Sequence, residues 1–251
     1  MPRRRFFVPP ENVQSNTARL TADQAHHVRH VLRVRAGDAV EVFDGMGNGY
    51  SGIVEIRGPE VYITSLERTK SGGELPLDLI LVLALTRADR FEWALQKATE
   101  LGAGEVIPVV TRYCEVSIPE NRLETRMERW RKIVREASKQ CRRFTIPRVG
   151  SPASFEEILK ARSFQDATRL LFYERAVARF AGETLASSRV VVCIGPEGGW
   201  DAEEIRAAEA AGYQIFSLGP RVLRTETAAM AALAILQYCL GDLGPSRTND
   251  E

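Results

Sequence analysis

Two glycine-rich segments near the C-terminus constrain the fold of this chain more than any other feature. Residues 195–199 read Gly-Pro-Glu-Gly-Gly, and residues 218–227 read Leu-Gly-Pro-Arg-Val-Leu-Arg-Thr-Glu-Thr. Each follows a short apolar run of strand character and precedes a helix-like segment. Glycine lets the main chain approach a flat or charged ligand closely, because no Cβ intervenes. Open α/β sheets bind small ligands where their strands end, so the two segments predict a ligand site.

The chain from residue 77 onward alternates apolar runs with amphipathic segments. We expect strands at 77–85, 105–110, 169–173, 190–194 and 214–217. We expect helices at 89–101, 121–140, 154–161, 201–211 and 225–240. Strands separated by helices favour a parallel sheet. This part of the chain therefore predicts an α/β domain.

Residues 1–72 have a different pattern, rich in short β signals. The expected elements are a helix at 22–34 and strands at 39–43, 50–56 and 61–66. Thr21 and Gln24 have the spacing of a capping box at the start of the helix, and the turn at 44–49 is typical of a hairpin. The polar segment 67–74 has the composition of a linker. We therefore predict a small β-barrel domain over 1–72, a larger domain over 73–244 and a disordered tail over 245–251.

Charge is unevenly distributed along the chain, although the formal net charge is only +1. Residues 1–35 hold seven Arg against two acids, and residues 111–150 hold eleven Lys or Arg against five acids. Residues 201–251 hold eight acids against four Arg. Two local basic surfaces suggest a polyanionic partner. The alternative is that both are solvated helix faces.

The cysteines and the apolar segments indicate a cytoplasmic protein. The four cysteines lie far apart and form no C-x-x-C pair, which is typical of a reduced intracellular chain. The apolar stretch at 6–10 is too short for a signal peptide and ends in two prolines. The longest apolar stretch, 228–236, is well short of the roughly 20 residues that a membrane helix needs. We expect neither a secretion signal nor a membrane span.

Two apparent ligand motifs are rejected on their context. Gly47, Gly49 and Gly52 fit the dinucleotide fingerprint G-x-G-x-x-G, but the residues after them continue as a strand, whereas the fingerprint requires a helix there. His26 and His30 are four residues apart on one predicted helix, yet no acidic or Cys ligand lies near in sequence to complete a zinc site. We expect no bound metal.

Four motifs, in order, resemble those of one known family. They are Thr-Arg-Ala-Asp-Arg-Phe-Glu at 86–92, Gln-Lys-Ala-Thr-Glu-Leu-Gly at 96–102, Ile-Gly-Pro-Glu-Gly-Gly at 194–199 and the segment 218–228. The chain is similar to the RsmE family of 16S rRNA uridine-N3 methyltransferases. Val-Leu-Arg at 31–33, Gly-Asp at 37–38 and Phe-Asp-Gly at 43–45 are similar to the PUA-like RNA-binding barrel of that family. The resemblance covers nearly the whole chain.

The resemblance implies a SPOUT-type methyltransferase domain, an α/β fold whose chain end is threaded into a deep trefoil knot. It implies S-adenosylmethionine as cofactor, 16S rRNA or the small ribosomal subunit as partner, and a homodimer in which the apolar helix around 228–236 takes part. The family's cofactor motifs fall on Leu171, Ile194, Gly195, Pro196, Glu197, Gly198, Gly199, Leu218, Gly219, Val222, Leu223, Arg224, Thr225, Glu226 and Thr227.

The implied reaction needs a group that removes the N3 proton and a cation that stabilises the negative charge on the uracil oxygens. Arg224 is the candidate cation, because it follows the bend at the pocket and stays charged at any relevant pH. Glu197 or Glu226 could accept the proton or face the sulfonium. Glu226 could equally cap the helix that starts beside it.

Candidate RNA-binding residues lie in both basic regions and, in the case of Arg87, between them. They are Arg3, Arg4, Arg5, Arg29, Arg33, Arg35, Arg87, Arg135, Lys139, Arg142 and Arg143. Ion pairs within the helix at 121–140 are the alternative for part of this set. Two other functions stay open: a knotted methyltransferase acting on another RNA atom, such as a tRNA ribose 2′-hydroxyl, and a non-enzymatic RNA-binding protein.

Overall fold

The computed structural model describes residues 4–32, 34–69, 77–180 and 187–244. Their contacts divide the chain into two compact units. The first unit comprises the described residues up to 69 together with Ser138–Ile146, and the second comprises 77–137 and 147–244. The predicted domain boundary at 72–73 and the predicted tail at 245–251 lie outside the described residues.

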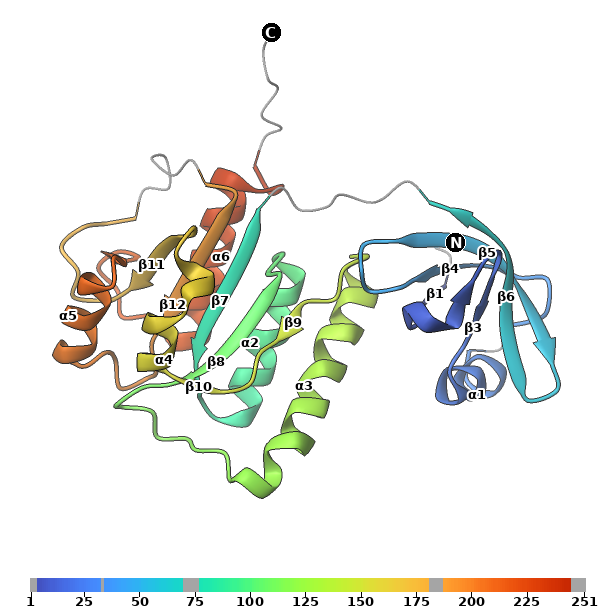
Figure 1. The fold of residues 1–251 in the computed structure, drawn as a ribbon, viewed down its shortest axis with the longest axis horizontal. Helices are drawn as coiled ribbons and strands as arrows, with labels where there is room; N and C mark the ends of the chain where they lie inside the picture. The colour runs from blue at the N-terminus through green and yellow to red at the C-terminus, as the bar shows by residue number, and fades with distance from the viewer. Residues whose placement is uncertain (1–3, 33, 70–76, 181–186, 245–251) are drawn as a thin grey trace, which may run out of the picture. The chain divides into compact units, whose positions relative to one another are not determined.

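The first unit is a curled sheet with one short helix (Figure 1). Its strands are β1 (Arg5–Phe7), β2 (Val13–Gln14), β3 (Thr17–Arg19), β4 (Ala39–Phe43), β5 (Gly49–Arg57) and β6 (Glu60–Arg68). They pair in the order β1-β4-β5-β6-β3-β2, with β1 and β4 parallel and the other pairs antiparallel. The 3₁₀ turn η1 (Pro10–Asn12) follows β1. The strands expected near β4, β5 and β6 are confirmed, whereas β1 to β3 are too short to show an alternating pattern.

The helix of the first unit, α1 (Ala22–His30), begins with the predicted capping box between Thr21 and Gln24. It ends four residues before the predicted end at 34. Ala25 and Val28 on this helix are buried in the apolar core of the unit, together with Val42, Val54 and other strand residues. The glycines that mimic a dinucleotide fingerprint lie around β5, which continues as a strand and opens no helix.

The segment Ser138–Ile146 packs on the first unit although it follows a helix of the second in sequence. The Gly47 N–H donates a hydrogen bond to the Phe144 carbonyl at 3.2 Å, and the Ile146 N–H donates to the Gly45 carbonyl at 2.9 Å. The Phe144 ring lies so close over Gly49 that a Cβ at that glycine would have no room. Two distant parts of the chain therefore build one core.

The second unit is a parallel sheet flanked by helices (Figure 1). Its strands are β7 (Asp78–Ala84), β8 (Glu105–Val110), β9 (Arg148–Val149), β10 (Ala153–Ser154), β11 (Thr168–Phe172), β12 (Arg189–Ile194) and β13 (Gln214–Phe216). They pair in the order β10-β8-β7-β12-β11-β13, and β9 adds to β8. Every pair is parallel. The predicted parallel α/β sheet is confirmed, whereas the trefoil knot stays a prediction from the resemblance.

The α-helices of the second unit begin and end within about two residues of the predicted positions. They are α2 (Ala88–Glu100), α3 (Glu120–Gln140), α4 (Phe155–Lys160), α5 (Ala202–Ala210) and α6 (Thr225–Leu240), and a short 3₁₀ turn that was not predicted, η2 (Arg162–Phe164), follows α4. Side chains alternate between the two faces of a strand. On β7 and β12, Val82 and Cys193 accordingly share one core cluster with Phe155 of α4 and Ala208 of α5. Helices α2 and α6 pack against each other, and Phe91 of α2 contacts the Trp130 ring of α3.

Candidate active site

A cavity lies where β11, β12 and β13 end, and its empty volume is about 480 Å³. The loops that leave these three parallel strands form its walls. Eight of the residues predicted to bind a cofactor line it: Ile194, Gly195, Pro196, Gly199, Leu218, Gly219, Leu223 and Thr225. This is the edge of the sheet at which an α/β fold places its ligand. The two glycine-rich segments therefore meet at one cavity, as their sequence predicts.

The loop 195–199 is held in place by buried contacts beneath it. The Trp200 Nε1–H donates a hydrogen bond to the Phe172 carbonyl at 3.0 Å, and its indole is only 5 % exposed. A Cβ at Gly195 would lie 2.7 Å from that indole nitrogen. On the other side, the Thr225 hydroxyl donates to the Gly195 carbonyl at 2.9 Å. Main-chain atoms of this loop thus form a fixed wall of the cavity.

The second glycine-rich segment forms the opposite wall of the cavity. Gly219 has φ of +111°, a conformation that residues with a Cβ rarely adopt. Leu218 and Leu223 offer apolar surface to the cavity. Val222, by contrast, is 83 % exposed and is absent from the lining.

Sequence reasoning missed six residues that line the same cavity: Phe172, Tyr173, Glu174, Trp200, Arg221 and Ala228. Three of them stand at the end of β11 or just after it, so the rule that ligands bind at strand ends would have found them. Glu174 adds a carboxylate to the wall and pairs with Arg175 at 3.6 Å. Leu171, which was predicted to bind, is fully buried inside β11 and does not line the cavity.

A second pocket shares the loop 195–199 with this cavity, and Pro196 lines both. Its empty volume is about 290 Å³. The residues that follow β7 contribute Leu85, Thr86 and Arg87; the loop after β8 contributes Tyr113, Glu115 and Val116; the shared loop adds Glu197 and Gly198. A Cβ at Gly198 would lie 2.8 Å from the Tyr113 Cβ, so the two loops touch directly.

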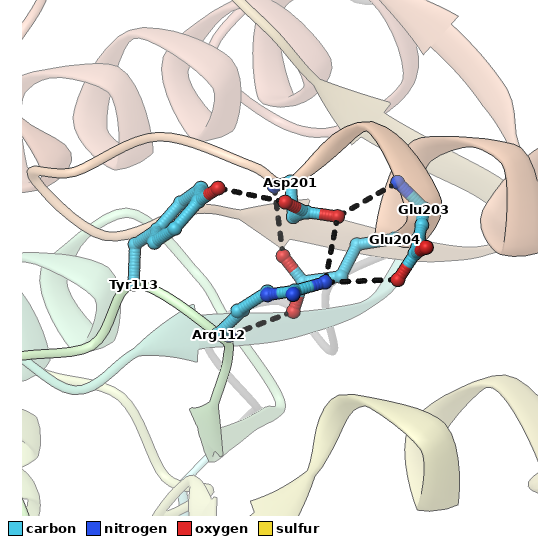
Figure 2. A network of polar contacts seen from close by, with 5 residues as sticks. All are labelled: Arg112, Tyr113, Asp201, Glu203 and Glu204. Atoms are coloured by element: carbon cyan, nitrogen blue, oxygen red, sulfur yellow. Dashed lines mark hydrogen bonds and ion pairs between the residues drawn. The ribbon is translucent and has the colours of Figure 1, made fainter.

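A polar network fastens the loop after β8 to the start of α5 (Figure 2). The Tyr113 hydroxyl donates a hydrogen bond to Asp201 at 2.7 Å, and the Arg112 guanidinium contacts Asp201 at 3.3 Å and Glu203 at 2.8 Å. The Arg112 N–H donates to Glu204 at 2.9 Å. The hydroxyl of Tyr113 lowers the pKa of the Asp201 carboxyl, with further help from the Glu203 N–H and from Arg112. The network sets the position of Tyr113 at the second pocket.

The two candidate general bases have different surroundings. Glu197 forms an ion pair with Arg90 of α2, and this hydrogen bond raises the pKa of the guanidinium. One Glu226 carboxylate oxygen is buried and accepts no hydrogen bond from the described residues. Helix α6 starts after Arg224 without a side-chain cap. Neither Arg224, Glu226 nor Thr227 is among the residues that line either cavity, so their cofactor and catalytic roles stay predictions.

The family models match the chain in two blocks. An RNA methyltransferase domain covers residues 73–237, and an RNA methyltransferase PUA domain covers residues 20–62. The ribosomal RNA small subunit methyltransferase E of a Synechocystis species is 34 % identical over 94 % of this chain and 78 % of its own length. The Bacillus subtilis protein of the same name is 30 % identical, over 93 % of this chain and 96 % of its own. The chain belongs to the ribosomal RNA small subunit methyltransferase E family.

Solved structures agree with this family membership. The methyltransferase E of Neisseria gonorrhoeae, bound to S-adenosyl methionine, is 32 % identical with a TM-score of 0.87, over 96 % of this chain and 99 % of that one. A putative methyltransferase of Legionella pneumophila with bound SAM is 30 % identical with a TM-score of 0.86, over 97 % and 100 %. The α/β fold with its N-terminal PUA-like sheet is therefore that of the family.

The RNA-binding residues predicted for this family member have unequal surroundings. Arg29, Arg35, Arg87 and Arg142 are exposed, and Arg4, also exposed, donates a hydrogen bond to the Leu32 carbonyl. Arg135, Lys139 and Arg143 are partly buried, and Arg3 and Arg33 lie outside the described residues.

Arg5 differs from the other predicted RNA-binding residues because its guanidinium is engaged inside the first unit. It stacks on Phe43 and Phe144 and donates to the carbonyls of Ser138 and Arg143, at 3.3 and 2.7 Å. These contacts give Arg5 a role in packing.

In the part of the chain that the structure describes, no helix has the length and apolar character to cross a membrane. The same residues contain no cluster of three or more His, Cys, Asp or Glu side chains arranged to hold a metal ion. His26 and His30 stack their rings on α1, 4.5 Å apart.

Proposed function

We propose that this protein transfers a methyl group from S-adenosylmethionine to N3 of a specific uridine in 16S rRNA of the small ribosomal subunit. The observation that carries the proposal is the cavity at the ends of β11, β12 and β13, whose walls come from the two glycine-rich segments of a family member. Relatives of the same family carry the name of a small-subunit rRNA methyltransferase, and one was crystallised with S-adenosyl methionine.

The residues of the cavity fit this cofactor. A Cβ at Gly219 would meet no atom of the described residues beyond its chain neighbours within 4 Å, so the main chain there leaves room for a flat adenine ring, and Leu218 and Leu223 offer apolar faces to it. Glu174 offers a carboxylate to ribose hydroxyls or to the cationic end of the molecule. When bound, S-adenosylmethionine supplies an electrophilic methyl group on a sulfonium. The residues that line the cavity would hold the cofactor beside the second pocket, since Pro196 borders both spaces.

The protein's contribution to the reaction is mainly position and charge. The methyl group must lie in line with the attacking nitrogen, the N3 proton must leave, and the charge on the uracil oxygens must be balanced. Arg224 precedes α6 and is exposed, so in this proposal it approaches the substrate only once RNA is bound. Glu197 is held by Arg90, which favours a role for Glu197 in shaping the loop.

The proposal also covers partners and location. Exposed arginines of the first unit, such as Arg29, Arg35 and Arg142, would contact RNA phosphates, and each contact should steepen the log–log salt dependence of binding by about 0.7–0.9. We infer a homodimer, in which exposed Trp93 of α2 and Tyr238 of α6 supply apolar contact area. A ribosomal substrate implies the cytoplasm, where cysteines stay reduced, and none of the four cysteines, all of which the structure describes, forms a disulfide.

The test is methyl transfer from labelled S-adenosylmethionine to small ribosomal subunits, naked 16S rRNA and tRNA from an unmodified source. The product nucleoside is identified by mass spectrometry. We expect 3-methyluridine in 16S rRNA, and the better substrate of the first two shows which assembly state is recognised. A ribose-methylated nucleoside, a product confined to tRNA, or no product would overturn the proposal.

A further inference from the structure

The second pocket contains two charged side chains that no described residue neutralises. Among the described residues, the side chains of Arg87 and Glu115 form no hydrogen bond or ion pair, and both line the pocket. The third charge there, Glu197, is already paired with Arg90. A free cation and a free carboxylate on one pocket wall are suited to a neutral ligand that offers both an acceptor and a donor.

The pocket offers an aromatic wall and polar side chains to one planar base. Tyr113 offers an aromatic ring, and such rings stack on unpaired bases in RNA. That ring is 45 % exposed, but Asp201 holds its hydroxyl at 2.7 Å and its Cβ rests on Gly198. The stacking surface is thus positioned before any ligand arrives.

We propose that this second pocket receives the target uracil, flipped out of the RNA, with Glu115 facing N3–H and Arg87 facing a neighbouring carbonyl oxygen. The inference rests on the proposed function and assigns its substrate site. Uracil offers an N–H between two carbonyl oxygens, which matches a pocket lined by both a carboxylate and a guanidinium. Cytosine has a bare acceptor at N3, which would meet the Glu115 carboxylate unfavourably, so the same pair selects uracil over cytosine.

In this proposal, each proton and each electron pair of the reaction has a defined destination. The N3–H bond breaks and its proton moves to the Glu115 carboxylate, while the charge that spreads to the carbonyl oxygen is balanced by Arg87. N3 uses the freed electron pair to form a bond to the methyl carbon. The carbon–sulfur bond breaks, and its electron pair stays on sulfur as a neutral thioether. Glu115 finally returns its proton to water.

The experiment compares Glu115→Gln and Arg87→Met with two control variants in the full-length protein. Glu120→Gln and Arg162→Met neutralise exposed charges at α3 and η2, and neither residue lines a cavity. The single-turnover rate is measured at saturating S-adenosylmethionine and RNA. Cofactor affinity is measured by calorimetry, and RNA affinity over a series of salt concentrations.

We expect Glu115→Gln to lower the rate by about 100-fold or more, the usual contribution of a general base. Arg87→Met should lower it by about 100-fold, since a lost stabilising donor typically costs that much. The cofactor affinity and the controls should stay within about twofold of the wild type. RNA containing 5-fluorouridine, whose N3–H is more acidic, should restore much of the Glu115→Gln rate, a rescue that a merely structural defect would not show.

Two outcomes would overturn the pocket assignment alone. Wild-type rates in both pocket variants would do so, provided that the wild type makes 3-methyluridine. The assignment would also be overturned if Arg87→Met kept its rate at saturation and only lowered the slope of log RNA affinity against log salt concentration by about 0.7–0.9, because that is the behaviour of a phosphate contact. Failure of the wild type to make 3-methyluridine, despite normal cofactor binding, would overturn the proposed function itself.

Discussion

The two neighbouring pockets are built in opposite ways. The first cavity, which we propose holds the cofactor, rests on main-chain atoms and on buried contacts such as those of Trp200 and Thr225. The second pocket is bordered by charged side chains, and its Tyr113 wall is held by a network that includes exposed Arg112 and Glu203. Buried hydrogen bonds are costly to leave unmade, whereas exposed ion pairs contribute little. The first site is thus fixed by the core, and the second can be adjusted with little effect on the fold.

The largest effect is expected where the core meets the cofactor cavity, in Gly195→Ala. The added methyl would collide with the Trp200 indole, and overpacking of this kind costs about 1–3 kcal/mol. We expect cofactor affinity to fall about 10- to 100-fold, measured by calorimetry. Gly104→Ala is the control, since its Cβ would meet nothing nearer than 3.4 Å. Equal affinity in the two variants would contradict a fixed cavity wall.

A smaller loss of stability should follow from Thr225→Val. The substitution leaves the Gly195 carbonyl without the hydroxyl that it accepts from at 2.9 Å, in a place where Thr225 is 4 % exposed. A buried acceptor left unpaired costs about 1–3 kcal/mol in the free energy of unfolding, which denaturant titration would measure. Thr225→Ser keeps the hydroxyl and should recover most of the loss. If Ser and Val were equally unstable, the hydrogen bond would not be the cause.

Gly198→Ala tests whether the second pocket can change shape without affecting the first. Its Cβ would press on the Tyr113 Cβ and carbonyl, so the loop after β8 should move while the cofactor cavity keeps its shape. We expect the methyl-transfer rate to fall by roughly tenfold, about 1.4 kcal/mol, with cofactor affinity unchanged. A parallel loss of affinity would mean that the shared loop moves as a whole and that the comparison drawn above is wrong.

The smallest effect concerns pH and Asp201. Its pKa lies below the ordinary value because Tyr113, the Glu203 N–H and Arg112 favour the carboxylate. The stabilisation is therefore present above the ordinary aspartate value of about 3.9 and is lost as the pH falls through the lowered value. Thermal unfolding midpoints of Asp201→Asn should lie slightly below the wild type at neutral pH and converge with it in acid. Glu209→Gln, on the exposed side of α5, is the control, and a constant gap at all pH values would contradict the linkage.

Sequence patterns predicted the repeating part of the fold, and they pointed to the strand ends at which the first cavity lies. Apolar runs and helical periodicity are local signals, so β8 (Glu105–Val110) and α6 (Thr225–Leu240) were placed to the residue. The glycines at 195–199 indicate a close approach of the main chain, and such a glycine-rich motif is also a local signal in the sequence. Leu171 and Val222 do not line the cavity, because a motif does not tell which face of a strand or loop a side chain takes.

The second pocket could not be predicted, because its parts are far apart in the chain. Tyr113 and Asp201 are 88 residues apart, and Arg90 and Glu197 are 107 apart. Only the parallel pairing of β7 with β8 and β12 brings the ends of these strands to one edge. Arg87 was expected to touch RNA on charge alone, and Glu115 carried no signal of its own in the sequence. Arg87 and Glu115 line the same pocket because β7 and β8, which precede them, are neighbours in the sheet.

The way in which Ser138–Ile146 completes the first unit has a practical consequence for dissecting this protein. A fragment cut near residue 72 would lose Phe144 from above Gly49 and the carbonyls that receive the Arg5 guanidinium. The surface that Phe144 covers would then be exposed to water. We expect such a fragment to aggregate, and weak RNA binding by it would reflect this loss of structure. An isolated first unit would need residues 138–146 joined to it by a short linker. For the same reason, the first unit cannot be exchanged between relatives as one continuous segment of the sequence.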